Sequence, residues 1–342
     1  MIQTHAYDAW TRDPYRQGAW WDLARMQLGG FPARQFLFLA GVSLVLRYSG
    51  DLRRHVDDWA SQRGALWRGL EVLIYGLLFR VAAWLISGAQ LKDLPEVGKV
   101  DILNCIGVSL CLTSLLVRPL HVSGRRFPYA ATAVAAAIVL WTPWVQHHPW
   151  PAWLPAPIAT YLWDATPIGT FPQLPFLAYT LAGAVVGIYW MRQSASGRLG
   201  RAMLYTAIVG ALVAVAVQYG NRMGYQIYRA SKEVPIPAFP SSFAYRTGMC
   251  LLMGSVAYLW TRLLPGDRFS PLRLMGQASL WVYLIHVELV YGRATWSIRH
   301  RLHPLTVTLL IVLLTGAMVA LSWWRIRVLP VWNQRLRARR AG

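Results

Sequence analysis

Histidine and carboxylate side chains near the start of the chain are spaced for acid–base chemistry. In the segment MIQTHAYDAW, Asp8 follows His5 by three residues, about one turn if the segment is helical. A carboxylate beside an imidazole orients the ring and raises its basicity, so this pair predicts a general base. The alternative interpretation is a histidine near a chain end that has no role in catalysis.

A second set of reactive side chains lies late in the chain, in SLWVYLIHVELVYG. Ser279, Tyr283 and His286 follow one another at i, i+4 and i+7 and so share one helix face. We take His286 as a candidate catalytic residue, and Ser279 and Tyr283 as candidate substrate-binding residues. The same face could instead supply hydrogen bonds that join helices in a membrane.

Charged residues inside apolar segments form a third set of candidates, because such groups are costly in a membrane. Asp101 and Asn104 open the apolar segment VDILNCIGVSLCLTSLL and are candidates for catalysis and substrate binding, respectively. The alternative for Asp101 is a carboxylate that stabilises a helix N-terminus. Arg246 could bind an anionic group or pair with Asp101. The i, i+3 spacing of Arg68 and Glu71 predicts an ion pair.

Several kinds of site are not indicated. The three cysteines form no spaced pair typical of zinc or redox sites, and the histidines do not cluster as metal ligands, so we expect no metal. The glycine-rich phosphate-binding motifs and the GxSxG motif of serine hydrolases do not occur.

The composition indicates what must position these residues. Of 342 residues, 56% are hydrophobic and only 14% are charged, with a mean hydropathy of +0.35. Soluble domains carry about 25% charged residues, so we predict an all-α polytopic membrane protein. The net charge of +20 lies mostly in arginines between apolar segments. We interpret it as loop charge facing an anionic membrane surface rather than as a nucleic-acid site.

A spanning helix needs about 20 mostly apolar residues. Segments of this kind lie at 33–48, 65–87, 100–117, 127–145, 174–191, 202–220, 243–263, 272–291 and 305–324. One set of alternating loops, together with the tail 325–342, holds 19 Lys and Arg residues, against 11 in the opposite set. The first set, and with it the C-terminus, is therefore predicted to be cytoplasmic.

The opposite set includes the Pro/Trp-rich loop 146–173, which we expect to be an ordered loop on the outer side. Nine spans with a cytoplasmic C-terminus leave residues 1–32 outside. This arrangement suggests that a first helix is missing upstream of Met1, for a total of nine to ten spans. The alternative is that residues 1–32 cross the membrane as a short tail.

Four pieces of the chain, taken in order, resemble one family. MIQTHAYDAW, FPARQFLFLAGVSLVLR, KVDILNCIGVSL and SLWVYLIHVELVYG are similar to the bacterial relatives of heparan-α-glucosaminide N-acetyltransferase, in the transmembrane acyltransferase superfamily. Such proteins usually begin with a helix that carries an Arg-Gly motif ahead of the histidine segment. No such helix precedes Met1, which agrees with the topology.

The resemblance implies transfer of an acyl group, typically acetyl from acetyl-CoA, to a sugar amine or hydroxyl across the bacterial inner membrane. The expected partners are acyl-CoA, a glycan or glycolipid acceptor and the lipid bilayer. The resemblance carries catalytic roles to His5, with Asp8 as its neighbour, to Asp101 and to His286. His5, or else His286, would then act as a base or as a transient acyl carrier. The whole chain, 1–342, would form one acyltransferase-like domain.

Two non-enzymatic alternatives remain, a transporter and a scaffold subunit for envelope glycan export. A transporter of known design would show broken helices and an inverted repeat, and neither is evident. An enzyme requires His5, Asp101 and His286 to converge on one tunnel, whereas a scaffold does not.

Overall fold

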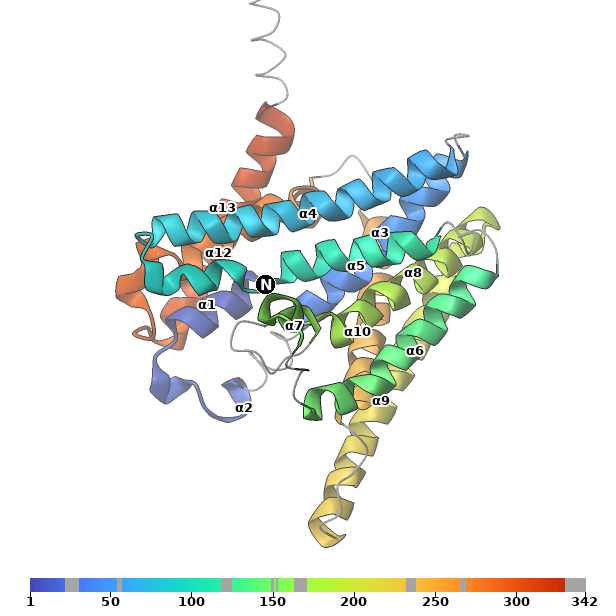
Figure 1. Ribbon diagram of the computed structural model, residues 1–342, viewed down its shortest axis with the longest axis horizontal. Helices are drawn as coiled ribbons and strands as arrows, with labels where there is room; N and C mark the ends of the chain where they lie inside the picture. The colour runs from blue at the N-terminus through green and yellow to red at the C-terminus, as the bar shows by residue number, and fades with distance from the viewer. Residues whose placement is uncertain are drawn as a thin grey trace, which may run out of the picture. The chain divides into compact units, whose positions relative to one another are not determined.

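The chain folds into α-helices joined by short 3-10 helices and turns. The computed structural model describes residues 1–21, 31–53, 57–117, 125–148, 151, 153–162, 171–231, 238–264 and 269–329. Over these residues it contains no β-strand (Figure 1). The all-α fold class predicted from the sequence is therefore confirmed.

Five helices in the described part of the chain are long and apolar enough to cross a membrane. Each coincides with a segment predicted to span, so the hydropathy pattern located these helices correctly. They are α4 (Asp58–Ile86), α6 (Arg126–His147), α8 (Gln173–Ala195), α9 (Leu199–Ser231) and α13 (Pro304–Trp323).

The other predicted spans are also helical but do not belong to this group of five. They include α3 (Phe31–Arg53), α5 (Ile102–Val117) and α10 (Ala238–Leu263). The 16 residues of α5 reach about 24 Å, short of the roughly 30 Å of a bilayer core. The total of nine to ten spans therefore stays a prediction.

The predicted span 272–291 differs from the structure. It consists of two helices, α11 (Pro271–Gln277) and α12 (Ser279–Tyr291), which are separated at Ala278. Ser270 caps α11, and Gly276, a weak helix former, lies in its last turn. As a consequence, His286 lies on a helix of 13 residues rather than on a full span.

Parts of two predicted segments lie outside the described residues. Within the loop 146–173 the structure describes helix α7 (Ala156–Leu162), whereas 149–150, 152 and 163–170 fall outside. Within the tail 325–342 it describes 325–329, where a π-helical turn, η5 (Trp324–Val328), continues α13.

The helices group into two compact units. The first unit comprises Met1–Pro32, Ala82–Gln90 and Thr261–Gly342, and the second comprises Ala33–Val81 and Leu91–Trp260. The first unit thus combines both ends of the chain.

Helix α1 (Ile2–Trp10) is anchored in the first unit by apolar and polar contacts. Ala6, Ala9 and Trp10 are buried against Val290 of α12 and Val307 of α13. The Trp10 indole donates a hydrogen bond to the carbonyl of Val290 at 3.2 Å. The backbone N–H groups of His300 and Leu302 donate to the carbonyls of Ala9 and Trp10 at 3.0 and 2.9 Å. The position of α1 is therefore fixed by its packing and by backbone hydrogen bonds.

Small residues and buried amides join the helices of the second unit. A Cβ atom at Gly107 of α5 would lie 2.8 Å from the carbonyl oxygen of Gly69 in α4, so only glycine allows this close approach. The Gln173 side chain of α8 accepts a hydrogen bond from Ser109 at 2.8 Å and donates one to the carbonyl of Cys105 at 3.1 Å. Both are contacts typical of helix packing in membranes.

Candidate active site

Two histidine rings from opposite ends of the chain meet in the first unit. His5 lies in α1 and His286 in α12, and their ring centroids are 5.4 Å apart. His286 is 1% exposed, and His5 is partly buried. Because α1 is held against α12 and α13, this proximity follows directly from the helix packing.

The His286 ring has one nitrogen occupied and one available. Its Nδ1 lies 2.6 Å from the carbonyl oxygen of Val282, one turn earlier in α12. A carbonyl only accepts hydrogen bonds, so Nδ1 carries the proton and Nε2 holds an unshared electron pair. Nε2 is buried and has no hydrogen-bond partner among the described residues. The Tyr283 ring packs edge-on against the imidazole at 5.7 Å.

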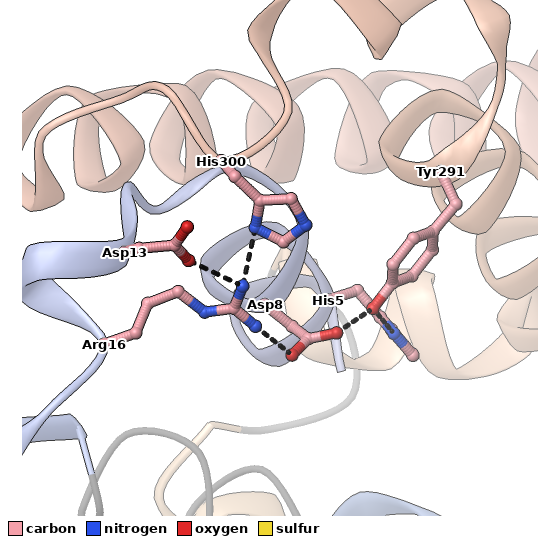
Figure 2. Close-up of polar contacts among 6 residues, drawn as sticks. All are labelled: His5, Asp8, Asp13, Arg16, Tyr291 and His300. Carbon is pink, nitrogen blue, oxygen red and sulfur yellow. Dashed lines mark hydrogen bonds and ion pairs between the residues drawn. The ribbon is translucent and has the colours of Figure 1, made fainter.

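His5 is linked to Asp8 through a tyrosine, Tyr291, at the end of α12. The His5 Nδ1 lies 3.2 Å from the Tyr291 hydroxyl, which donates a hydrogen bond to Asp8 Oδ2 at 3.1 Å. Figure 2 shows the hydroxyl between the imidazole and the carboxylate. The sequence predicted that Asp8 would orient His5 directly, whereas this link runs through Tyr291.

Arg16 holds the other oxygen of the Asp8 carboxylate. Its Nη2 lies 3.4 Å from Asp8 Oδ1, and its Nη1 lies 3.4 Å from Asp13 Oδ1 and 2.7 Å from His300 Nδ1. Figure 2 shows the guanidinium between these three side chains. Since arginine only donates, His300 must accept through an unprotonated Nδ1.

The environment of His5 favours the neutral imidazole. The pKa of His5 is lowered from 6.5 to about 4, mainly by burial and also by the positive amino terminus, whereas the Asp8 carboxylate acts in the opposite direction. At neutral pH the ring therefore has an unshared pair with which to accept a proton or attack a carbonyl carbon.

One family model matches this chain. Its description is "Heparan-alpha-glucosaminide N-acetyltransferase, catalytic", and it matches residues 1–216. The chain belongs to this family. Membership implies acyltransferase activity in a membrane protein, and it confirms the resemblance found in the sequence motifs. No curated protein matches the chain at a significant level.

The N-acetyltransferase family match covers part of the site residues predicted from the sequence. His5, Asp8, Asp101 and Asn104 lie within residues 1–216. Arg246, Ser279, Tyr283 and His286 follow it along the chain, as do Tyr291 and His300. The side chains in contact with one another form one group, the histidine cluster: His5, Asp8, Arg16, His286, Tyr291 and His300. The cluster thus combines the N-terminal part of the matched region with segments beyond that region.

Asp101 belongs to the second unit, where it forms contacts of a structural kind. Its Oδ2 lies 3.0 Å from Arg80 Nη2, and its Oδ1 accepts a hydrogen bond from the backbone N–H of Ile102 at 2.6 Å. It therefore lies at the N-terminus of α5, where the alternative interpretation placed it. The sequence suggested Arg246 as its ion-pair partner, whereas the structure pairs it with Arg80.

The other candidates divide between the two units. Asn104 is buried in α5 of the second unit, and the guanidinium of Arg246 in α10 lies 5.9 Å from the Tyr245 ring. Ser279 and Tyr283 lie with His286 on α12 of the first unit. Of the three residues expected to converge, the structure brings together His5 and His286 within the first unit.

Sequence reasoning missed three members of the cluster, namely Tyr291, Arg16 and His300. Tyr291 lies five residues after His286 and so is displaced by about 140° around α12 from the face that carries His286. Arg16 and His300 lie outside apolar segments, where a charged residue needs no special explanation. Only the fold brings these side chains together.

Among the described residues, no three His, Cys, Asp or Glu side chains are grouped so as to hold a metal ion.

Proposed function

We propose that this protein is an integral-membrane acetyltransferase that transfers an acetyl group from acetyl-CoA to a sugar amine or hydroxyl. The observation that carries the proposal is the meeting of the His5 and His286 rings at 5.4 Å in a chain of this family. Two buried or partly buried imidazoles offer a base and a second proton acceptor in one place.

Two routes use these rings. In the first, His5 takes a proton from the acceptor hydroxyl or amine, and the oxygen or nitrogen of the acceptor attacks the thioester carbonyl. The carbon–sulfur bond then breaks, and the CoA thiolate leaves and receives the proton. His286 provides a second site at which the proton can rest, because its Nε2 has an unshared pair.

In the second route, His5 carries the acyl group. Its Nε2 attacks the thioester carbon, the carbon–sulfur bond breaks and CoA leaves as the thiolate. The acceptor then attacks the acyl carbon and the bond to the imidazole breaks. The proton lost by the acceptor passes to His286 Nε2 and from there to the thiolate.

The remaining candidates take supporting roles in this proposal. Asp8 orients the His5 imidazole, and Ser279 and Tyr283 position the substrate or stabilise the developing oxyanion. Asp101 is the second candidate carboxylate, and Arg246 and Asn104 are candidate substrate-binding groups of the second unit.

The proposed sidedness follows from the charge distribution. Acetyl-CoA approaches from the cytoplasmic side of the bacterial inner membrane, where arginine-rich loops attract its phosphates. The acceptor, a glycan or glycolipid, is modified on the outer side.

The test uses purified protein in detergent with radiolabelled acetyl-CoA and an amino sugar as the acceptor. We expect CoA release in the wild type, and a loss of about 100-fold or more in His5→Ala and His286→Ala, the range expected for removal of an acid–base group. His148→Ala, which removes an exposed imidazole of the second unit, is the matched control and keeps full activity. Full activity in His5→Ala would overturn the proposal.

The same preparation separates the two routes. Without an acceptor, the carrier route predicts transient labelling of the wild-type protein, and this label is lost in His5→Ala. The base route predicts transfer to an acceptor sugar with no labelled protein at any time.

A further inference from the structure

We infer that Tyr291 is a positioning residue that holds His5 with its proton on Nδ1 and so leaves Nε2 free to act on the substrates. This inference rests on the proposed function, which gives His5 its chemical role. The geometry that points to it is the short chain of contacts from His5 Nδ1 through the Tyr291 hydroxyl to the Asp8 carboxylate.

Counting protons along this chain assigns the tautomer. The Asp8 carboxylate only accepts, so the single hydroxyl proton of Tyr291 is directed to Asp8 Oδ2. The Tyr291 oxygen is then an acceptor toward His5, and the proton between them must come from Nδ1. A neutral imidazole carries one proton, so Nε2 has the unshared pair.

The tyrosine is itself held in place. Its ring packs against the buried cluster that contains Ala6, Trp10 and Val290, and it meets the His5 ring edge-on at 80° with centroids 5.4 Å apart. Tyr291 is also the last residue of α12, so its backbone is fixed by the same helix that carries His286.

The carboxylate at the far end of the chain is fixed as well. Arg16 lies against Asp8 Oδ1 at 3.4 Å, and its guanidinium is shared with Asp13 and donates to His300 Nδ1. Asp8 is therefore held from one side by Arg16 and from the other by the Tyr291 hydroxyl (Figure 2). A carboxylate held in this way keeps the Tyr291 proton directed away from His5.

This arrangement predicts that Tyr291 and Asp8 act as a unit. Tyr291→Phe keeps the ring and its packing but removes the acceptor for the Nδ1 proton. In Asp8→Asn the one remaining oxygen faces Arg16, which only donates, so the amide nitrogen faces the Tyr291 hydroxyl and no longer accepts its proton. After either change the His5 proton is no longer held on Nδ1. The double variant should therefore lose no more activity than either single variant.

The matched control is Tyr7→Phe. Tyr7 lies on the same helix as His5, and its hydroxyl also forms a hydrogen bond across the unit, to Thr308 Oγ1 at 2.8 Å. Tyr7→Phe removes a similar phenolic hydroxyl and a similar hydrogen bond, and it leaves the contacts of His5 and Asp8 unchanged. We expect Tyr7→Phe to keep the wild-type tautomer and the wild-type kcat.

The experiment measures the ¹⁵N spectrum of histidine-labelled full-length protein in lipid vesicles, with the His5 signals assigned by their absence in His5→Gln. We expect protonated Nδ1 and unprotonated Nε2 in the wild type and a population with protonated Nε2 in Tyr291→Phe. In parallel, kcat of Tyr291→Phe should fall about tenfold at an unchanged KM, as expected for the loss of one hydrogen bond.

Two results would overturn the inference. One is a wild-type His5 with its proton on Nε2. The other is an unchanged tautomer in Tyr291→Phe, even if its activity falls, because Tyr291 would then contact the substrate instead. The spectrum tests the tautomer of His5 and needs no substrate. The proposed function is tested separately, by the activity of His5→Ala, and full activity there would contradict it.

Discussion

His5 shows how burial of a single residue determines the pH range in which the histidine proposed as the base can work. The pKa of His5 is lowered to about 4, mainly by burial. The neutral ring is the form that accepts a proton or attacks a thioester. It is therefore lost only as the pH falls through about 4, rather than through 6.5.

This predicts the acid limb of the pH profile. We expect kcat/KM for acetyl transfer to stay level from neutral pH down to about pH 5 and to fall below it, since the limb follows the pKa of the free enzyme. In Asp8→Asn the limb should move to still lower pH, because the carboxylate that raises the pKa is gone. A wild-type limb near 6.5 would contradict this prediction.

Residue spacing predicted part of the site. The one-turn separation of His5 and Asp8 is found in α1, and Tyr283 and His286 are neighbours on α12. The spacing could not predict that Tyr291 lies between His5 and Asp8. Tyr291 is 286 positions from His5 and 283 positions from Asp8 along the chain, so both contacts depend on how α1 packs against α12.

Individual helices follow hydropathy in their position but not in their limits. The apolar pattern located the five long apolar helices of the described chain, because composition decides which segments avoid water. It did not predict the separation of α11 from α12 at Ala278, nor the extension of α9 to Ser231. These limits depend on local capping and on neighbouring helices, which a hydropathy average does not register.

The link between α4 and α5 gives a prediction about stability. Asp101→Asn keeps a residue that can cap α5 but removes the charge that pairs with Arg80, whose side chain is 22% exposed. We expect the free energy of unfolding to fall by about 2–3 kcal/mol, because a partly buried guanidinium loses its counter-charge. The measurement is the midpoint of thermal unfolding in detergent.

Glu71→Gln is the matched control for this change. It removes the acid of the Arg68–Glu71 ion pair, in which both side chains are more than one third exposed. Exposed pairs contribute about 0–1 kcal/mol, so the midpoint should hardly move. If Asp101→Asn unfolded like the wild type yet lost activity, the structural role would be wrong and the catalytic role of Asp101 would gain support.

At the scale of the whole chain, the histidine cluster depends on both ends of the sequence. The family match ends at residue 216, whereas His286, Tyr291 and His300 lie in the part that follows. The first unit unites α1 with α12 and α13, so the matched region alone does not contain the cluster. The sidedness of the chain is a prediction from its loop charge.

Cysteine labelling can test this sidedness within the second unit. Ser196 is exposed in the turn between α8 and α9, close in sequence to Arg192, Arg198 and Arg201, and Trp153 is 81% exposed in the Pro/Trp-rich segment. Positive charge retains loops on the cytoplasmic side. We therefore expect a membrane-impermeant maleimide to label Trp153→Cys in intact spheroplasts, and Ser196→Cys only after permeabilisation.

The parent protein sets the background for this labelling. Cys105 and Cys250 are buried and Cys111 is half-buried, so reaction at the native thiols should be weak. Labelling of Ser196→Cys in intact spheroplasts, with Trp153→Cys protected, would show that the orientation is opposite to the predicted one. Acetyl-CoA could then no longer approach from the arginine-rich face, and the proposed direction of transfer would fail even if His5-dependent acetyl transfer were observed in detergent.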